Sequence, residues 1–371
     1  MKFKDVDFKD EYSSYYNFEI DHSRFTENFF EYEQGQKDII RYACEVDGLP
    51  DVLVEKVSSL PELLKQSKAD STYLSYKRGF NRWRKWVISN GLNSGEALPA
   101  KAFHVALYIV SLIQTANTIS PILNAVYSIK WYHDLFEFPS PTDSRLVKNV
   151  VEGGKRKLAK PIHKKEPMAV ELLHKMFSHM YAEKNIMNQR FICICLIAFA
   201  GFLRSAEVLK LKRSDICFYD SYLSIFIESS KTDKYREGVW VLIARIGTCL
   251  CPVANLEKYI CWTGIRPDSE CFLFGRLTAT KDGHVLRNQD KPLSYSNFRD
   301  LFVQTFKKLV DDVNKFCSHS LRAGGATAAA NNGIPDRLFK RHGRWHSETA
   351  KDGYVKSSVD ERLRVSKYLG L

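Results

Sequence analysis

Apolar residues recur at helical spacing through the first half of the chain. Between residues 70 and 91, Tyr73, Tyr76, Phe80, Trp83 and Val87 step by 3 and 4, which predicts one buried face of an amphipathic helix. Asp70 or Ser71 is expected to cap its N-terminus. Further helices are expected at about 97–115, 120–136 and 142–158, so residues 59–158 are predicted to form a compact helical bundle.

The second half mixes helical patterns with two short strand-like runs. Residues 221–227 and 239–244 are rich in β-branched and aromatic residues and flank a polar turn, which predicts a β-hairpin. Helices are expected at about 168–182, 187–199, 252–263, 295–312, 320–331, 335–341, 347–353 and 359–369. The fold class is therefore mainly α, with a small antiparallel sheet in the region 168–371.

Charge divides the chain unevenly. Residues 1–55 hold 6 Lys/Arg and 14 Asp/Glu, a net of −8, whereas the remainder holds 49 and 29, a net of +20. We interpret residues 1–58 as an acidic, partly disordered N-terminal extension. The basic remainder suits a polyanionic partner, since each neutralised phosphate releases counterions. A basic surface kept only for solubility is the alternative.

Two groups of basic residues are candidates for contact with nucleic acid. One lies on the predicted helix 70–91 and the other surrounds a predicted interdomain linker, residues 159–167. The glycines and prolines from Gly153 to Pro167 also favour a linker. The candidates are Lys77, Arg78, Arg82, Lys85, Lys155, Arg156, Lys157, Lys164 and Lys165. A solvated charged face is the alternative for the first group, and a nuclear-import signal for the second.

Cysteine usage and hydropathy bear on the compartment. The nine cysteines are scattered and form no CxxC pair, so we expect buried, reduced thiols and no zinc site. The longest apolar runs, 102–113 and 191–203, are shorter than the ~18–20 residues of a membrane span. We expect a soluble, intracellular protein, in the nucleus if its host is eukaryotic and in the cytoplasm if it is bacterial.

Candidate chemistry lies in three separate segments. Arg204 begins a predicted helix, with Glu207 three residues later. Lys231 is placed at the tip of the predicted hairpin. The segment His319-Ser320-Leu321-Arg322-Ala323-Gly324-Gly325 leads to Trp345 and, nine residues further on, to Tyr354. Taken alone, each residue has an ordinary role, such as a helix ion pair, a solvated lysine or a core tryptophan.

The order of these residues resembles the tyrosine recombinase (phage integrase) family. The resemblance covers roughly residues 168–358, and the bundle at 59–158 looks like that family's core-binding (SAM-like) domain. It implies the DNA breaking-rejoining fold, with residues 168–371 as the catalytic domain. One extra residue between Gly201 and Arg204, and tryptophan where many relatives have histidine, suggest the mobile-element (crypton- or DIRS-like) branch.

The resemblance also implies a mechanism. Arg204 and Arg322 would hold the non-bridging oxygens of the scissile phosphate. Tyr354 would attack phosphorus and form a 3′-phosphotyrosine, with His319 accepting the phenol proton and Lys231 protonating the 5′-oxygen. Trp345 would donate to phosphate or pack the tyrosine helix, and Glu207 would support the site. Such chemistry needs no metal, ATP or other cofactor.

Relatives of this kind act on duplex DNA as tetramers that exchange their terminal helices. The apolar tail Leu363, Val365, Leu369 and Leu371 suits such an exchange, or folding back onto its own domain. Two other functions remain open from the residues alone. One is a DNA-binding regulator that no longer cuts, and the other is a type IB topoisomerase.

Overall fold

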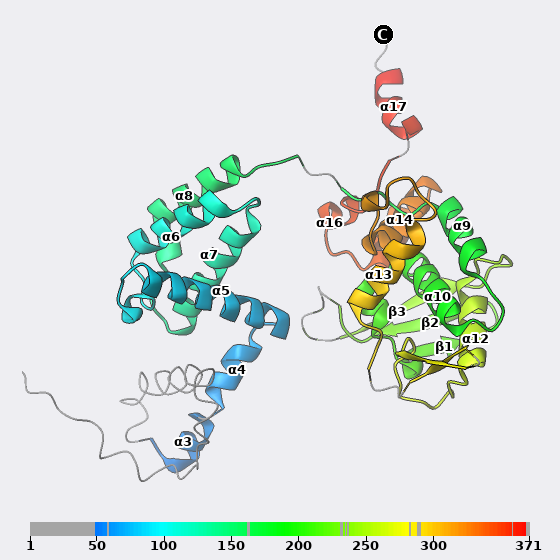
Figure 1. The fold of residues 1–371 in the computed structure, drawn as a ribbon, viewed down its shortest axis with the longest axis horizontal. Coiled ribbons are helices and arrows are strands. Elements are labelled where there is room, and N and C mark those ends of the chain that lie inside the picture. The colour runs from blue at the N-terminus through cyan, green and yellow to red at the C-terminus, as the bar shows by residue number, and fades with distance from the viewer. Residues whose placement is uncertain are drawn as a thin grey trace, which may run out of the picture. The chain divides into compact units, whose positions relative to one another are not determined.

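The computed structural model describes residues 49–368, apart from 58, 162–163, 231–232, 234, 236, 282, 288–290 and 358. The chain divides into two compact units at Pro161 and Ile162 (Figure 1). Each unit has its own hydrophobic core. The greater part of the expected acidic extension, residues 1–48, lies outside the described residues, as do Cys44, Lys231, Leu369 and Leu371.

The first unit is helical throughout its described part. Its helices are α3 (Asp51–Val57), α4 (Leu60–Gln66), α5 (Asp70–Ser89), α6 (Ala102–Thr115), α7 (Ser120–Leu135) and α8 (Arg145–Lys157). The bundle expected at 59–158 is thus helical. Helix α3 falls inside the segment that we interpreted as an acidic, partly disordered extension. Its seven residues carry no clean apolar period, so the pattern did not reveal it.

The apolar stripe predicted on α5 faces the core. Phe80, Trp83 and Val87 are buried, and Phe80 stacks on Tyr132 of α7 with ring centroids 3.9 Å apart. The indole N–H of Trp83 donates to the carbonyl of Ala97, at 3.0 Å. The expected cap was wrong, because the N-cap position is Ala69 and no side chain caps the helix there.

Gly153 and Gly154 lie in α8, which ends at Lys157, inside the helix expected at 142–158 and before the linker expected at 159–167. Their composition had favoured a linker, yet both residues are helical. A Cβ added to Gly154 would stand 2.6 Å from the Cδ1 of Ile113, so this glycine allows α8 to pack closely on α6. A diglycine therefore marks a helix contact here and not the end of the helix.

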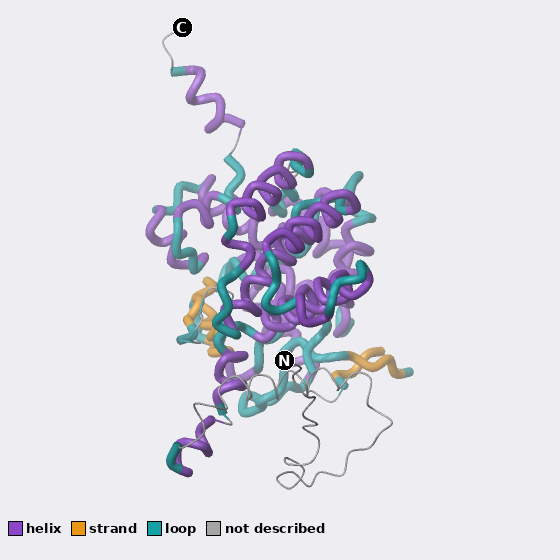
Figure 2. Tube along the Cα trace, turned by 90° about the vertical axis from the view of Figure 1, so that its left-hand side faces the viewer, coloured by secondary structure: helices purple, strands orange, loops and turns teal. Residues whose placement is uncertain are grey.

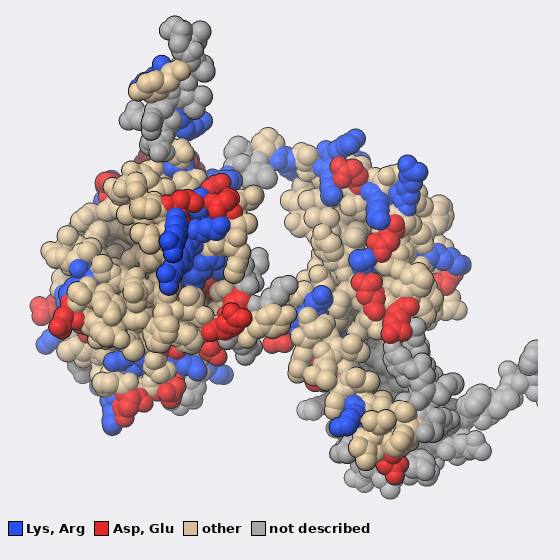
Figure 3. Space-filling view, turned by 180° about the vertical axis from the view of Figure 1, so that it is seen from behind, with Lys and Arg blue, Asp and Glu red and all other residues tan. Residues whose placement is uncertain are grey.

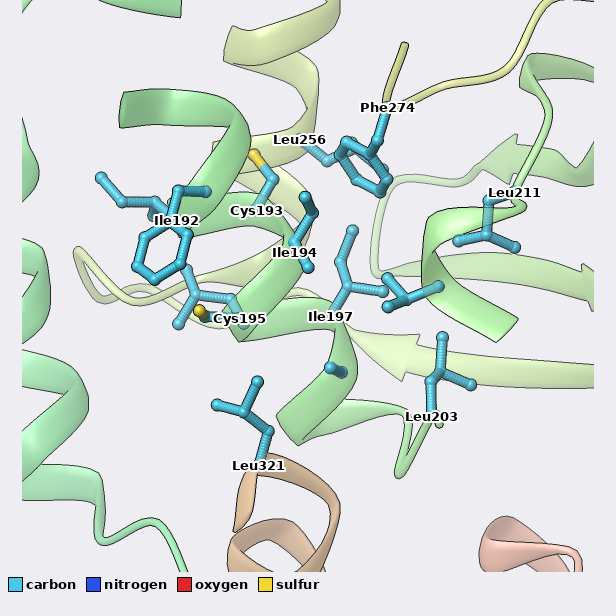
Figure 4. Packing of buried hydrophobic residues seen from close by; sticks show 14 of the residues in the cluster. Ile192, Cys193, Ile194, Cys195, Ile197, Leu203, Leu211, Leu256, Phe274 and Leu321 are labelled. Carbon is cyan, nitrogen blue, oxygen red and sulfur yellow. The ribbon is translucent and has the colours of Figure 1, made fainter. Parts of the chain in front are cut away.

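The second unit contains one helix buried on all sides. Its helices are α9 (Val170–Met180), α10 (Ile186–Ala200), α11 (Ser205–Leu209), α12 (Pro252–Thr263), α13 (Tyr295–Phe306), α14 (His319–Asn331), α15 (Asp336–Gly343), α16 (Glu348–Asp352) and α17 (Val359–Lys367). Every residue of α10 from Gln189 to Ala198 is buried. Figure 4 shows Leu321 of α14 pointing towards this helix. Such all-round burial is typical of a central core helix.

Two antiparallel sheets complete the second unit (Figure 2). The predicted hairpin is β2 (Tyr222–Ile227) and β3 (Val239–Ala244), with Tyr222 opposite Ala244. The sequence did not reveal β1 (Ile216–Phe218), β4 (Leu277–Thr280) or β5 (Gly283–Leu286), which have only three or four residues each. The strand order β1-β2-β3 leaves β3 at an edge of its sheet.

The described cysteines are all free thiols, but not all are buried. Cys193 and Cys195 lie in α10 and are fully buried, as predicted. Cys249 and Cys261 are exposed, which corrects the expectation of burial. Cys261 lies on the solvent side of α12, whose other side, with Leu256 and Tyr259, packs in the core. No helix among the described residues is long and apolar enough to cross a membrane.

Candidate active site

Arg204 occupies the N-cap position of α11, where the first turn of that helix fixes both its backbone and its side chain. Its backbone N–H donates to Oε2 of Glu207 at 2.8 Å, while its Nη1 donates to Oε1 of the same carboxylate at 2.6 Å. The carboxylate three residues into a helix is well placed to accept from the N-cap. Glu207 is buried, whereas the Arg204 side chain keeps 15% of its surface exposed. The pairing predicted from the i, i+3 spacing is therefore formed.

Arg322 is fully buried at the first turns of α14. Its guanidinium donates to the carbonyls of Phe202 and Gly343, the latter at 2.7 Å, and its Nη1 lies 4.0 Å from Oε2 of Glu207. Burial, together with the guanidinium groups of Arg204 and Arg344, lowers the pKa of Arg322 to about 10. The group therefore stays charged at neutral pH.

The segment before Trp345 reaches over the end of α10. Nε2 of His342 lies 2.8 Å from the carbonyl of Ala200, and Arg344 donates to the carbonyls of Gly201 and Phe202. Nη2 of Arg344 also donates to Oε2 of Glu207, at 2.9 Å. Carbonyls at the C-terminal end of a helix carry partial negative charge, which favours cationic partners. A single carboxylate thus lies among three guanidinium groups.

Tyr354 and Trp345 pack around the same arginine. The guanidinium carbon of Arg322 lies 4.9 Å from the Trp345 ring centroid and 5.0 Å from that of Tyr354. The two aromatic rings are 5.5 Å apart. Trp345 is buried and also contacts Phe339, whereas Tyr354 is half-buried.

Three buried N–H groups at this place lack an acceptor within the part of the chain that the structure describes. They are Nε of Arg322, Nε of Arg344 and Nε1 of Trp345. A buried donor without a partner costs free energy, so native structures rarely leave one unless a ligand or water satisfies it. Their grouping beside two surplus positive charges indicates a site for an anion.

His319 lies on the accessible side of the site. It is exposed and lines a pocket of about 440 Å³ with Tyr354, Lys164, Lys165 and Lys356. His319 and Arg322 are three residues apart on α14, yet one is exposed and the other is not. The i, i+3 spacing would place both side chains on one face of the helix, but only His319 is accessible. Lys231 lies outside the described residues, so its place remains a prediction.

The other basic candidates are distributed over both units. Arg78 and Lys85 are exposed on α5, while Arg82 donates to Asn124 at 2.7 Å and Lys77 is half-buried. Lys155 and Arg156 lie near Glu152, at 3.2 and 3.9 Å. Lys157 is exposed at the end of α8. Figure 3 shows lysine and arginine side chains on both units, with acidic side chains among them.

Comparison with known proteins fits this geometry. The family model described as the phage integrase family matches residues 168–361, just over half of the chain. The chain belongs to the phage integrase family. It is accordingly a site-specific tyrosine recombinase, an enzyme that transfers DNA strands.

Similar proteins cover most of this phage integrase family member. An integrase/recombinase XerD homologue of Selenomonas ruminantium is 24% identical over 296 residues, 79% of this chain and 83% of that protein. The XerH recombinase in a post-cleavage complex with its palindromic difH substrate aligns with a TM-score of 0.51 and 16% identity, over 80% and 77% of the two chains. The Tn1549 transposon integrase in complex with transposon right-end DNA aligns with a TM-score of 0.52 and 16% identity, over 80% of this chain and 93% of that chain. At this identity the structures support the fold alone.

Sequence reasoning missed two residues of this site. Arg344 and His342 contact residues more than 140 positions earlier, a separation that no local pattern reveals. Arg344 directly precedes Trp345 in the sequence, and this adjacency was the available signal.

Proposed function

We propose that this recombinase cuts and rejoins DNA through a covalent bond between Tyr354 and a 3′-phosphate. The observation that supports it most is the contact of the Tyr354 ring with Arg322, beside buried donors that lack an acceptor. A phosphodiester that entered here would offer oxygens to the guanidinium of Arg322 and the indole N–H of Trp345. No cofactor enters the proposal, because the phosphotyrosine bond itself retains the energy for rejoining.

The roles of the side chains follow from their chemistry. Arg204 and Arg322 bind the non-bridging oxygens and stabilise the charge of the transition state. The phenol loses its proton to His319 as its oxygen bonds to phosphorus, and the bond from phosphorus to the 5′-oxygen breaks. Lys231 gives a proton to that leaving oxygen. Glu207 holds the arginines, and Trp345 packs against both Arg322 and Tyr354.

The DNA partner is proposed to contact basic residues of both units. We assign residues 59–158 to DNA binding as the core-binding domain, 159–167 to a basic linker that crosses the backbone, and 168–371 to catalysis. The exposed Arg78 and Lys85 of α5, and Lys164 and Lys165 beside the pocket, suit contacts with phosphates. Removing such contacts should weaken binding and flatten its salt dependence.

We further propose a tetramer on DNA in which α17 docks on a neighbouring copy. Val359 and Leu363 of this helix keep 70% and 43% of their surface exposed, and burying them in a partner is favourable. Removing residues 359–371 should then leave the DNA-bound complex smaller in sedimentation. An unchanged size would favour a helix that stays with its own unit.

Two finer assignments complete the proposal. Trp345 at the histidine position and the extra residue before Arg204 support the crypton- or DIRS-like branch of mobile-element recombinases. That branch would place the enzyme in a nucleus, and a bacterial host would place it in the cytoplasm.

The test uses duplex DNA with a nick beside the cleavage position, so that the released fragment diffuses away and rejoining cannot occur. The wild-type protein should leave a protein–DNA adduct that survives denaturant. Tyr354→Phe should bind equally and leave none. Tight binding without an adduct would favour the regulator, and relaxation of plasmids of arbitrary sequence would favour the topoisomerase.

A further inference from the structure

Arg344 has a backbone conformation that arginine rarely adopts. It is the C-cap of α15, with φ 56° and ψ 41°, in the left-handed region. Glycine is the usual residue at such a helix end, because a Cβ is strained there. Non-glycine residues persist in this region when their surroundings hold them, and they cluster at functional sites.

Its side chain makes contacts that glycine could not make. The side chain is 7% exposed, and its guanidinium donates to the carbonyls of Gly201, Phe202 and His342, at 3.2, 3.0 and 3.2 Å. Its fourth acceptor is Oε2 of Glu207, at 2.9 Å. Four acceptors in different directions match the planar, multi-donor shape of a guanidinium and not the single point of an ammonium.

Each of these contacts supports an arginine of the proposed phosphate site. Glu207 accepts from both the backbone and the side chain of Arg204, so a fixed carboxylate fixes Arg204. The carbonyl of Phe202 accepts from Arg322 as well as from Arg344. The pocket lining that contains His319 and Tyr354 includes none of Arg204, Arg322 and Arg344.

We propose that Arg344 is a positioning residue for strand cleavage, holding Arg204 through Glu207 and bracing the carbonyl that Arg322 binds. The inference rests on the proposed function, which assigns Arg204 and Arg322 to the phosphate. Arg344 also leaves the buried cluster with a surplus of two positive charges over Glu207. The contacts of the Arg344 side chain offset its strained backbone, and they hold Arg204 and Arg322 in place before the reaction begins.

Arg344→Gly is the decisive variant, because it removes the side chain while glycine suits the backbone conformation. Single-turnover adduct formation on the nicked duplex, at saturating DNA, should slow by about 10- to 100-fold, the range expected when a catalytic group is slightly misplaced. The Kd for DNA should change little. Arg344→Lys should recover only part of the rate, because one ammonium cannot reach four acceptors. Arg299→Ala is the control. It removes an exposed ion pair with Asp300 and should form the adduct at the wild-type rate.

A double-mutant cycle separates positioning from general damage to the fold. If Arg344 acts through Arg204, its loss should slow Arg204→Lys several-fold less than it slows the wild-type protein. Full additivity of the two losses, or wild-type cleavage by Arg344→Gly, would overturn the inference. So would a slow rate explained entirely by a lower folded fraction in thermal melts.

If the wild-type protein forms no adduct, the proposed function fails, and the inference fails with it. An adduct with wild type and equal rates for Arg344→Gly refutes the inference alone.

Discussion

The ring of Tyr354 covers the guanidinium of Arg322, whose carbon lies 5.0 Å from the ring centroid. Arg322 is fully buried in this arrangement, with Trp345 also against it. A phosphate cannot reach Arg322 until the tyrosine ring or the arginine moves. The proposed nucleophile therefore shields one of the groups that would activate its target.

Replacing the ring tests this shielding directly. Tyr354→Ala removes the cation–π contact, which is typically worth ~0.5–2 kcal/mol, whereas Tyr354→Phe keeps it. Neither variant can form the adduct, but Tyr354→Ala should bind the DNA site about 2- to 30-fold more tightly than Tyr354→Phe at the same salt concentration. Equal dissociation constants would show that DNA binding does not require this contact to open.

Gly325, the second glycine of the segment from His319 to Gly325, allows the backbone of α14 to lie close to the backbone of α10. A Cβ on Gly325 would stand 2.1 Å from the carbonyl oxygen of Phe199 and 2.7 Å from the ring of Phe202. Gly325→Ala should therefore lower the free energy of unfolding by about 1–3 kcal/mol, measured by denaturant titration.

Gly153→Ala is the matched control for that substitution. Gly153 is exposed in α8, and an added Cβ would meet nothing within 4 Å. Its replacement should stabilise the helix by up to about 1 kcal/mol. If Gly325→Ala also raised the free energy of unfolding, the close approach of α14 to the carbonyl of Phe199 would be contradicted.

His133 makes the stability of the first unit sensitive to pH. It is fully buried; its Nε2 accepts from the N–H of Ala100 at 2.9 Å, and its Nδ1 lies 2.7 Å from the carbonyl of Ile129. Burial lowers the pKa of His133 below its ordinary value. The unfolded chain therefore binds more protons below about pH 6.5, and this contribution to stability falls as the pH drops.

His133→Gln should lose less stability than wild type between pH 7.5 and 5.5, because glutamine can accept from Ala100 without titrating. Denaturant midpoints of the full chain at the two pH values measure this difference. Both proteins should keep a second source of acid sensitivity in the second unit, since burial also lowers the pKa of His342. An identical pH-dependent loss in both proteins would contradict the account of His133.

The proposed acid role of Lys231 can be tested by substitution. Lys231→Ala should slow cleavage of ordinary DNA, because the leaving 5′-oxygen would lack a proton donor. A 5′-thio leaving group needs little protonation, so it should restore most of the rate. Equal slowing on both substrates would remove Lys231 from the acid role.

The parts of the fold that local patterns predict are those that local contacts determine. Helix α12 has the expected bounds, 252–263, and Arg204 pairs with Glu207 as their spacing indicates. The conformation of Arg344 depends on acceptors that lie far away in the sequence, so no pattern within its helix could reveal it. Gly153 and Gly154 favoured a linker by composition although they lie in the predicted helix 142–158, because the need for Gly154 arises only against Ile113 of another helix.

The central claim is that Tyr354 is the nucleophile, and the most direct measurement is to find which residue carries the DNA. The denatured adduct from a nicked duplex should be digested with protease and nuclease and its peptides sequenced by mass spectrometry. We predict a nucleotide joined through its 3′-phosphate to Tyr354. A nucleotide on any other residue, or on a 5′-phosphate, would contradict the proposed chemistry.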